Sequence, residues 1–260
     1  MDGPDVVVFE GGNGFQVHGE IIGLTSMTVN WFDLDVGQYV LEREQAWFDA
    51  ASVDIFGFNA MQIGQCHVDF LRANRMPFRF TSSVGDGNMR SRPEELPIAS
   101  QAIDLIALPH ALEFSPNPHQ LLREVERVLR PEGHLLLAGF NPLSLWGLKR
   151  LTGSGLDYPW NGRFLHLTRI KDWLSLMGFE LLAGRMVCYA PPVNNSRWLR
   201  RFGFMESAGD RWWAMGGGVY LLHAIKRVHG MRLIAPRWDE KWLAKPILVP
   251  PSNRVIKGKQ

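Results

Sequence analysis

A short polar segment near the middle of the chain holds the side chains best suited to chemistry. The apolar run 103–108 ends at Pro109, and His110 and Glu113 follow it closely. In open α/β sheets, residues just beyond the carboxyl end of a central strand face the ligand crevice. An imidazole with an ordinary pKa of about 6.5 can orient a substrate or take up a proton there. His110 is therefore the candidate catalytic residue; the alternative is a loop histidine with a solvated ring.

A single glycine after an earlier strand is the second feature that could serve a ligand. Residues 60–63 are predicted to form a strand, with Gly64 and Gln65 directly after it. Glycine lets the backbone approach a ligand without a side chain in the way. The pattern G-x-G-x-x-G does not occur after this strand, which argues against a nicotinamide-dependent oxidoreductase.

Two strands and a helix must position the segment around His110. The run 103–108 is too short for a typical helix and predicts a strand covered on both faces. Apolar residues then recur at helical spacing over 118–129, where Asn117 can cap the helix and Pro118 suits its first turn. Residues 134–138 predict a second buried strand. Two such strands joined by an amphipathic helix form a right-handed crossover in a parallel sheet.

The remaining elements are predicted from periodicity and from start and stop signals. Residues 35–50 predict an amphipathic helix with Glu42, Arg43 and Glu44 on the side opposite the apolar residues, either as a packing helix or as a lid. Thr168 is expected to cap a helix that Gly178 ends. Further predicted elements are a short helix at 68–74, strands at 78–81 and 179–182, a helix at 143–151 and a closing strand at 218–227.

An insertion before the closing strand, residues 187–217, carries a basic segment with tryptophans. Ser196 is expected to cap a helix over 196–204, in which Arg197, Arg200 and Arg201 form a basic face beside Trp198. Such a helix could contact acidic lipid or a partner; the alternative is core packing with a solvated outer face.

Composition excludes several classes of protein. The chain has 260 residues, of which 46% are hydrophobic and 21% charged, as in soluble globular proteins. A net charge of +2 is too small to indicate nucleic acid. Cys66 and Cys188 form no disulfide framework or zinc pattern, so we expect buried thiols and no metal site. Without a secretion signal or a membrane-spanning run, a cytoplasmic location is predicted, with peripheral membrane contact left open.

The segment around the crossover also resembles a known family. The series Glu95-Leu96-Pro97, then Ile103-Asp104-Leu105-Ile106, then His119-x-x-Leu122-x-Glu124-x-x-Arg127-Val128-Leu129-x-Pro131-x-Gly133 is similar to the class I S-adenosylmethionine-dependent methyltransferases of the type 11 branch. The resemblance implies a Rossmann-like α/β fold. Its sheet would be seven-stranded and mostly parallel, with helices on both faces and the last strand antiparallel at the sheet edge.

The resemblance also implies S-adenosylmethionine as cofactor and assigns residues to it. Gly64 and Gln65 would form the loop against the donor, although Gln62 stands where an acidic residue is usual. Asp86 would bond the ribose hydroxyls, unless it is a simple turn aspartate between glycines. Backbone atoms near Glu95 and Leu96, or the side chain of Glu94 or Glu95, would meet the adenine, unless this segment is only a surface loop. Pro109 and His110 would lie beside the methyl donor.

Two functions are compatible with this set of residues. The first is methyl transfer to an unidentified small-molecule acceptor, an in-line displacement that depends on alignment more than on an acid or base. The second is a methyltransferase-like binding or scaffold protein without turnover, which the single-glycine loop motivates. No base-methylation motif is present, so nucleic acid is not the expected acceptor. The predicted organisation is an N-terminal arm at 1–34, a methyltransferase-like domain at 35–230 and a basic, disordered tail at 231–260.

Overall fold

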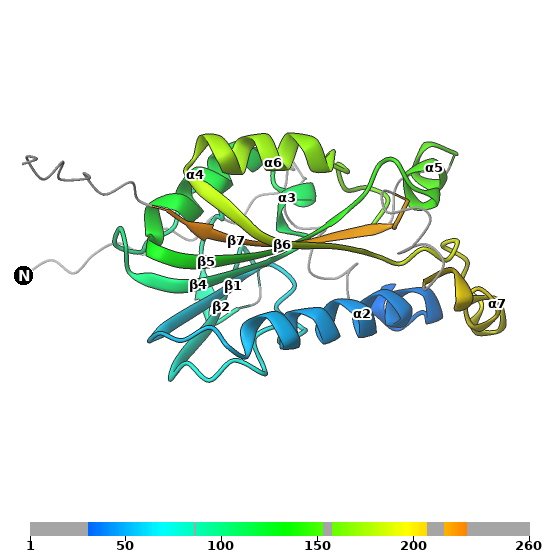
Figure 1. Ribbon diagram of the computed structural model, residues 1–260, viewed down its shortest axis with the longest axis horizontal. Helices are drawn as coiled ribbons and strands as arrows, with labels where there is room; N and C mark the ends of the chain where they lie inside the picture. The colour runs from blue at the N-terminus through cyan, green and yellow to red at the C-terminus, as the bar shows by residue number, and fades with distance from the viewer. Residues whose placement is uncertain (1–30, 86, 153–157, 207–215, 228–260) are drawn as a thin grey trace, which may run out of the picture. The chain divides into compact units, whose positions relative to one another are not determined.

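A computed structural model of the protein describes residues 31–85, 87–152, 158–206 and 216–227 (Figure 1). All of the described residues belong to the first of two units of the chain, which ends at Val228. The basic tail, most of the N-terminal arm and Asp86 lie outside the described residues. Trp31 and Phe32, from the end of the expected arm, belong to the hydrophobic core.

The core of the first unit is one seven-stranded sheet with the order β3-β2-β1-β4-β5-β7-β6. Neighbouring strands from β3 to β5 pair in parallel, whereas β7 is antiparallel to both β5 and β6. The strands are β1 Asn59–Ile63, β2 Phe78–Ser83, β3 Met89–Arg90, β4 Ile103–Pro109, β5 Leu129–Phe140, β6 Phe179–Val187 and β7 Val219–Lys226. The predicted mostly parallel α/β sheet with an antiparallel last strand is confirmed.

The prediction that the last strand lies at the sheet edge is wrong. Strand β7 lies between β5 and β6, and β6 is the edge strand. Burial explains the order, since every residue of β7 except His223 is buried, whereas most of β6 is exposed. A long apolar strand at the edge of a sheet would leave a row of unpaired backbone groups exposed, so a strand like β7 is favoured inside the sheet.

Helices cover both faces of the sheet (Figure 1). Helix α2 (Asp35–Ser52) packs on one face, with Leu105 and Ala107 of β4 in the same hydrophobic cluster. Helices α4 (Pro118–Val128) and α6 (Leu167–Leu176) pack on the other face, with Ile106 and Leu108 of β4. Successive residues of β4 thus point to opposite layers, as the unbroken apolar run predicts. The shorter helices are α3 Ala111–Phe114, α5 Leu145–Thr152 and α7 Ser196–Arg201.

Helix ends agree with the sequence signals in part. The Asn117 side chain accepts a hydrogen bond from the Gln120 N–H at 3.2 Å, which confirms the predicted cap. Gly178, with a φ of +80°, ends α6 as predicted. Helix α6 begins at Leu167, so His166 and not Thr168 is its N-cap.

Three further expectations are corrected. Asn195 caps α7, because its side chain accepts from the backbone N–H groups of the next turn, and Ser196 is already helical. Residues 68–74 form turns instead of a helix. Glu44, placed on the solvent side of its helix by periodicity, is completely buried. The helix 35–50 itself is confirmed as α2.

Candidate active site

A cleft opens where the parallel strands β1, β2 and β4 end. Residues 63–67 after β1, 83–85 after β2 and 109–111 after β4 line it, together with residues 92–94 and Tyr158. It holds about 840 Å³ of space, part of which is open to solvent. The carboxyl ends of parallel strands are the usual place for a ligand in such sheets.

The cleft brings together four of the predicted site residues, Gly64, Gln65, Pro109 and His110. Glu95 and Leu96 do not line it: Glu95 faces solvent, whereas Leu96 is buried and donates its N–H to Glu124. Asp86 lies outside the described residues. Sequence reasoning missed Tyr158, which reaches the cleft from a distant loop with no motif to mark it.

Gln62 builds the loop after β1. Its buried amide Nε2 donates to three carbonyl oxygens, those of Gly64 at 3.1 Å, Gln65 at 3.0 Å and Val68 at 2.8 Å. Its Oε1 accepts from the Phe70 N–H at 2.9 Å. A carboxylate could not donate to these carbonyls. The amide at this position therefore closes a loop that contains a single glycine.

The loop beside the cleft contains one glycine and one unsatisfied side-chain atom. Gly64 has a φ of +83°, and a Cβ there would meet nothing nearer than Ala111 Cβ and Pro109 O, both at 3.6 Å. Gln65 donates from Nε2 to Tyr158 Oη at 2.7 Å, which leaves its Oε1 buried with no hydrogen-bond partner among the described residues. A buried acceptor of this kind costs free energy unless a ligand or water satisfies it.

Three buried ionisable side chains form a cluster behind the cleft wall. His110 Nε2 lies 2.5 Å from Glu44 Oε1, and His110 Nδ1 lies 3.0 Å from Glu113 Oε1. The His110 side chain is 1% exposed, and both carboxylates are fully buried. Burial lowers the pKa of His110, but the charges of Glu44 and Glu113 outweigh it and raise the pKa to about 10. The imidazole is therefore a cation at neutral pH.

The cluster fixes His110 in place and leaves it no free ring nitrogen. The ring also stacks on Phe140 with centroids 4.1 Å apart, and Glu113 Oε1 accepts from the Phe140 N–H at 2.7 Å. The arrangement therefore suits orientation and electrostatics better than proton uptake from an acceptor. Glu44 and Glu113 each keep one buried carboxylate oxygen without a hydrogen-bond partner among the described residues. Sequence reasoning missed Glu44 because it lies in a charged run on an amphipathic helix.

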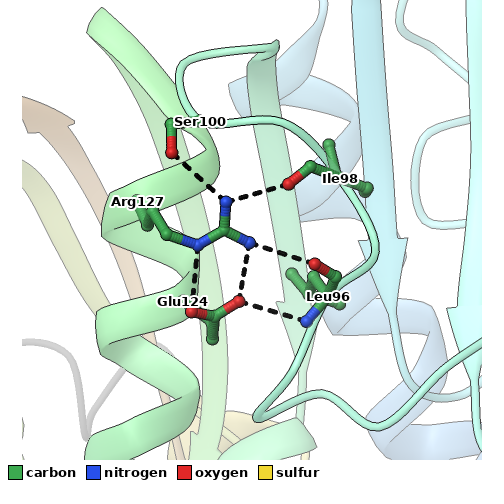
Figure 2. Close-up of polar contacts among 5 residues, drawn as sticks. All are labelled: Leu96, Ile98, Ser100, Glu124 and Arg127. Atoms are coloured by element: carbon green, nitrogen blue, oxygen red, sulfur yellow. Dashed lines mark hydrogen bonds and ion pairs between the residues drawn. The ribbon is translucent and has the colours of Figure 1, made fainter.

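Helix α4 holds the loop that forms another wall of the cleft (Figure 2). The Arg127 guanidinium donates to the carbonyl oxygens of Leu96 at 3.0 Å and Ile98 at 2.9 Å. Glu124 Oε2 accepts from the Leu96 N–H at 3.1 Å and pairs with Arg127 at 2.8 Å. This hydrogen bonding with Arg127 lowers the pKa of Glu124. Glu124 and Arg127 thus hold this loop through its backbone. The same loop carries Glu94, whose carboxylate accepts a hydrogen bond from Ser115 Oγ; both residues line the cleft.

The described residues contain no cluster of three or more side chains able to hold a metal ion. No helix in the described ranges is long and apolar enough to cross a membrane. Cys188 is buried as expected, whereas Cys66 is only partly buried and lines the cleft.

Comparison with known proteins finds one matching family model and relatives that are similar to part of this chain. Residues 75–137 match the family model described as a methyltransferase domain. A protein of Escherichia coli K12 named uncharacterized protein YafS is 34% identical over 161 residues, which cover 58% of this chain and 65% of that protein. A malonyl-[acyl-carrier protein] O-methyltransferase of Haemophilus ducreyi is 34% identical over 89 residues, covering 34% of this chain and 31% of that enzyme. The chain thus spans less than two thirds of the length of these relatives.

Solved structures share the fold at low sequence identity. An S-adenosylmethionine-dependent methyltransferase of Archaeoglobus fulgidus is 13% identical with a TM-score of 0.54, covering 76% of this chain and 98% of that one. A possible histamine N-methyltransferase of Thermotoga maritima is 15% identical with a TM-score of 0.53, covering 76% of this chain and 94% of that one. At this identity the likeness concerns the fold alone.

Proposed function

We propose that this chain, whose residues 75–137 match a methyltransferase domain, transfers a methyl group from S-adenosylmethionine to a small-molecule acceptor. The observation that carries the proposal is the cleft where β1, β2 and β4 end, with Gly64 in its lining. The acceptors named for the Haemophilus enzyme and the Thermotoga protein differ, so they suggest no single acceptor for this chain.

The residues of the cleft fit the donor in their chemistry. Gly64 lets the backbone come close to the methionine part of the donor. The unsatisfied Gln65 Oε1 can accept a hydrogen bond from its ammonium group. The Glu94 carboxylate, on the wall formed by residues 92–94, is available to the adenine or ribose donors. Bound there, S-adenosylmethionine would supply an activated methyl group on a sulfonium.

The buried cluster holds the His110 ring in the wall of the cleft. Glu44 and Glu113 each contact one ring nitrogen of His110, and their charges raise its pKa to about 10. His110 also lines the cleft, so the ring that they hold forms part of its wall. We assign His110 a positioning role, with no proton transfer through its ring.

Calorimetric titration of the full chain with S-adenosylmethionine and S-adenosylhomocysteine tests the proposal. We expect micromolar affinity for both. In a Gly64→Val variant the added methyl groups enter the cleft, so affinity should fall at least tenfold. Gly178→Val is the matched control, because Gly178 has a similar φ of +80° and a Cβ there meets only Arg227 O. It should lose similar stability and keep donor affinity.

The result also separates enzyme from scaffold. Binding followed by transfer of radiolabelled methyl to a metabolite extract would support an enzyme. Binding without transfer to any acceptor would favour the catalytically inactive alternative. Absent or millimolar binding of both nucleosides would overturn the assignment of the cleft.

A further inference from the structure

Helices α5 and α7 lie at one end of the unit (Figure 1). Large apolar side chains on and near them are exposed. On and before α5, Leu143 is 65% exposed, Leu148 56% and Leu151 77%; on α7, Trp198 is 49% exposed. Leu145 and Val193 are exposed beside them. Contiguous apolar patches on soluble proteins mark sites of interaction.

The segment that leads into α7 is hydrogen-bonded to α5. Lys149 of α5 donates to Pro192 O at 2.5 Å, just before the α7 cap Asn195. Trp146, on the buried side of α5, donates to Ala190 O at 3.0 Å. The exposed residues form what we call the α5–α7 surface: Leu143, Leu145, Leu148, Leu151, Val193, Arg197, Trp198, Arg200 and Arg201.

The charge of this surface is positive. Arg197, Arg200 and Arg201 are exposed, and none of them forms an ion pair with another described residue. The nearby Asp35 carboxylate accepts a hydrogen bond from the Ser196 N–H at 2.9 Å. Apolar residues beside unpaired guanidinium groups are complementary to a layer that is anionic outside and apolar inside.

We propose that the α5–α7 surface docks the protein on an anionic lipid bilayer. The leucines and Trp198 would enter the boundary between headgroups and acyl chains, while the arginines contact lipid phosphates. A bilayer is favoured over an acidic protein because protruding leucines need no preformed pockets in lipid. The proposal does not depend on methyl transfer, although α5 follows the carboxyl end of β5, at the same end of the sheet as the cleft.

Vesicle flotation of the full chain tests the surface directly. We expect binding to phosphatidylcholine vesicles that contain phosphatidylglycerol, and little binding to phosphatidylcholine alone. Changing Arg200 and Arg201 to Gln should lower the partition coefficient about fivefold per arginine. Changing Leu148 and Leu151 to Gln should lower the partition coefficient about tenfold, since both positions then lose their apolar contact with the acyl chains in the bound state.

Matched variants on the opposite part of the molecule serve as controls. Leu176 of α6 is 83% exposed, and Arg123 of α4 is exposed as well, so Leu176→Gln and Arg123→Gln should leave binding unchanged. Circular dichroism of each variant checks that it folds. Absent binding to anionic vesicles would overturn the proposal. So would undiminished binding by both double variants, which would place the lipid contact on another basic segment.

Discussion

His110 Nε2 and Glu44 Oε1 lie 2.5 Å apart in the protein interior, although 66 positions separate the two residues in the chain. This contact fastens the helix before the sheet, α2, to the end of its central strand β4. One side of His110 thereby becomes part of the cleft wall, and the other side is anchored in the core. The geometry of the cleft depends on this ion pair.

Removing the Glu44 carboxylate should destabilise the fold. A Glu44→Ala variant loses one half of a buried ion pair, which costs about 3 kcal/mol of unfolding free energy. Urea denaturation measures the loss. Glu42→Ala, on the exposed side of the same helix, is the control and should change stability by less than about 0.5 kcal/mol. Equal losses in the two variants would contradict a buried ion pair at Glu44.

Stability should be greatest near neutral pH and fall on both sides, for two separate reasons. The pKa of His110 is raised to about 10, so the folded protein binds more protons than the unfolded chain between about pH 6.5 and 10, and stability falls as pH rises. Burial and the neighbouring His134 lower the pKa of His223 to about 4, so stability falls as pH drops from about 6.5 to 4. Thermal unfolding across this range measures both slopes, and a His223→Gln variant should flatten only the acid one.

Sequence patterns predicted most of the longer elements and the location of the cleft, because these depend on local periodicity and on the general rule for parallel strands. The burial of Glu44 could not be predicted, since its partner His110 lies far away in the chain and periodicity treats a charged residue as outward. The order of β6 and β7 was also missed at the sequence level, because strand order depends on which edges are covered. Tyr158 carries no local signal for its contact with Gln65.

Replacing Gln62 by Glu would introduce the acidic residue that the resemblance to methyltransferases leads us to expect at this position, yet we expect it to be harmful here. The carboxylate would face the carbonyl oxygens of Gly64, Gln65 and Val68, to which the amide now donates. A buried group left unpaired in this way costs about 3 kcal/mol. Urea denaturation and calorimetry should show lower stability and weaker donor binding. Wild-type stability and donor affinity in Gln62→Glu would show that the loop tolerates an acid.

Arg127 should matter for the cleft although it does not line it. An Arg127→Ala variant leaves the carbonyl oxygens of Leu96 and Ile98 without their donor and Glu124 without its partner, which costs about 2 kcal/mol. Hydrogen exchange should then quicken over residues 94–100, and donor affinity should fall because the wall at Glu94 is no longer fixed. Arg123→Ala, one turn earlier on the exposed side of α4, should change neither. If exchange over this loop stays at the wild-type rate, the Arg127 contacts do not hold the wall in place.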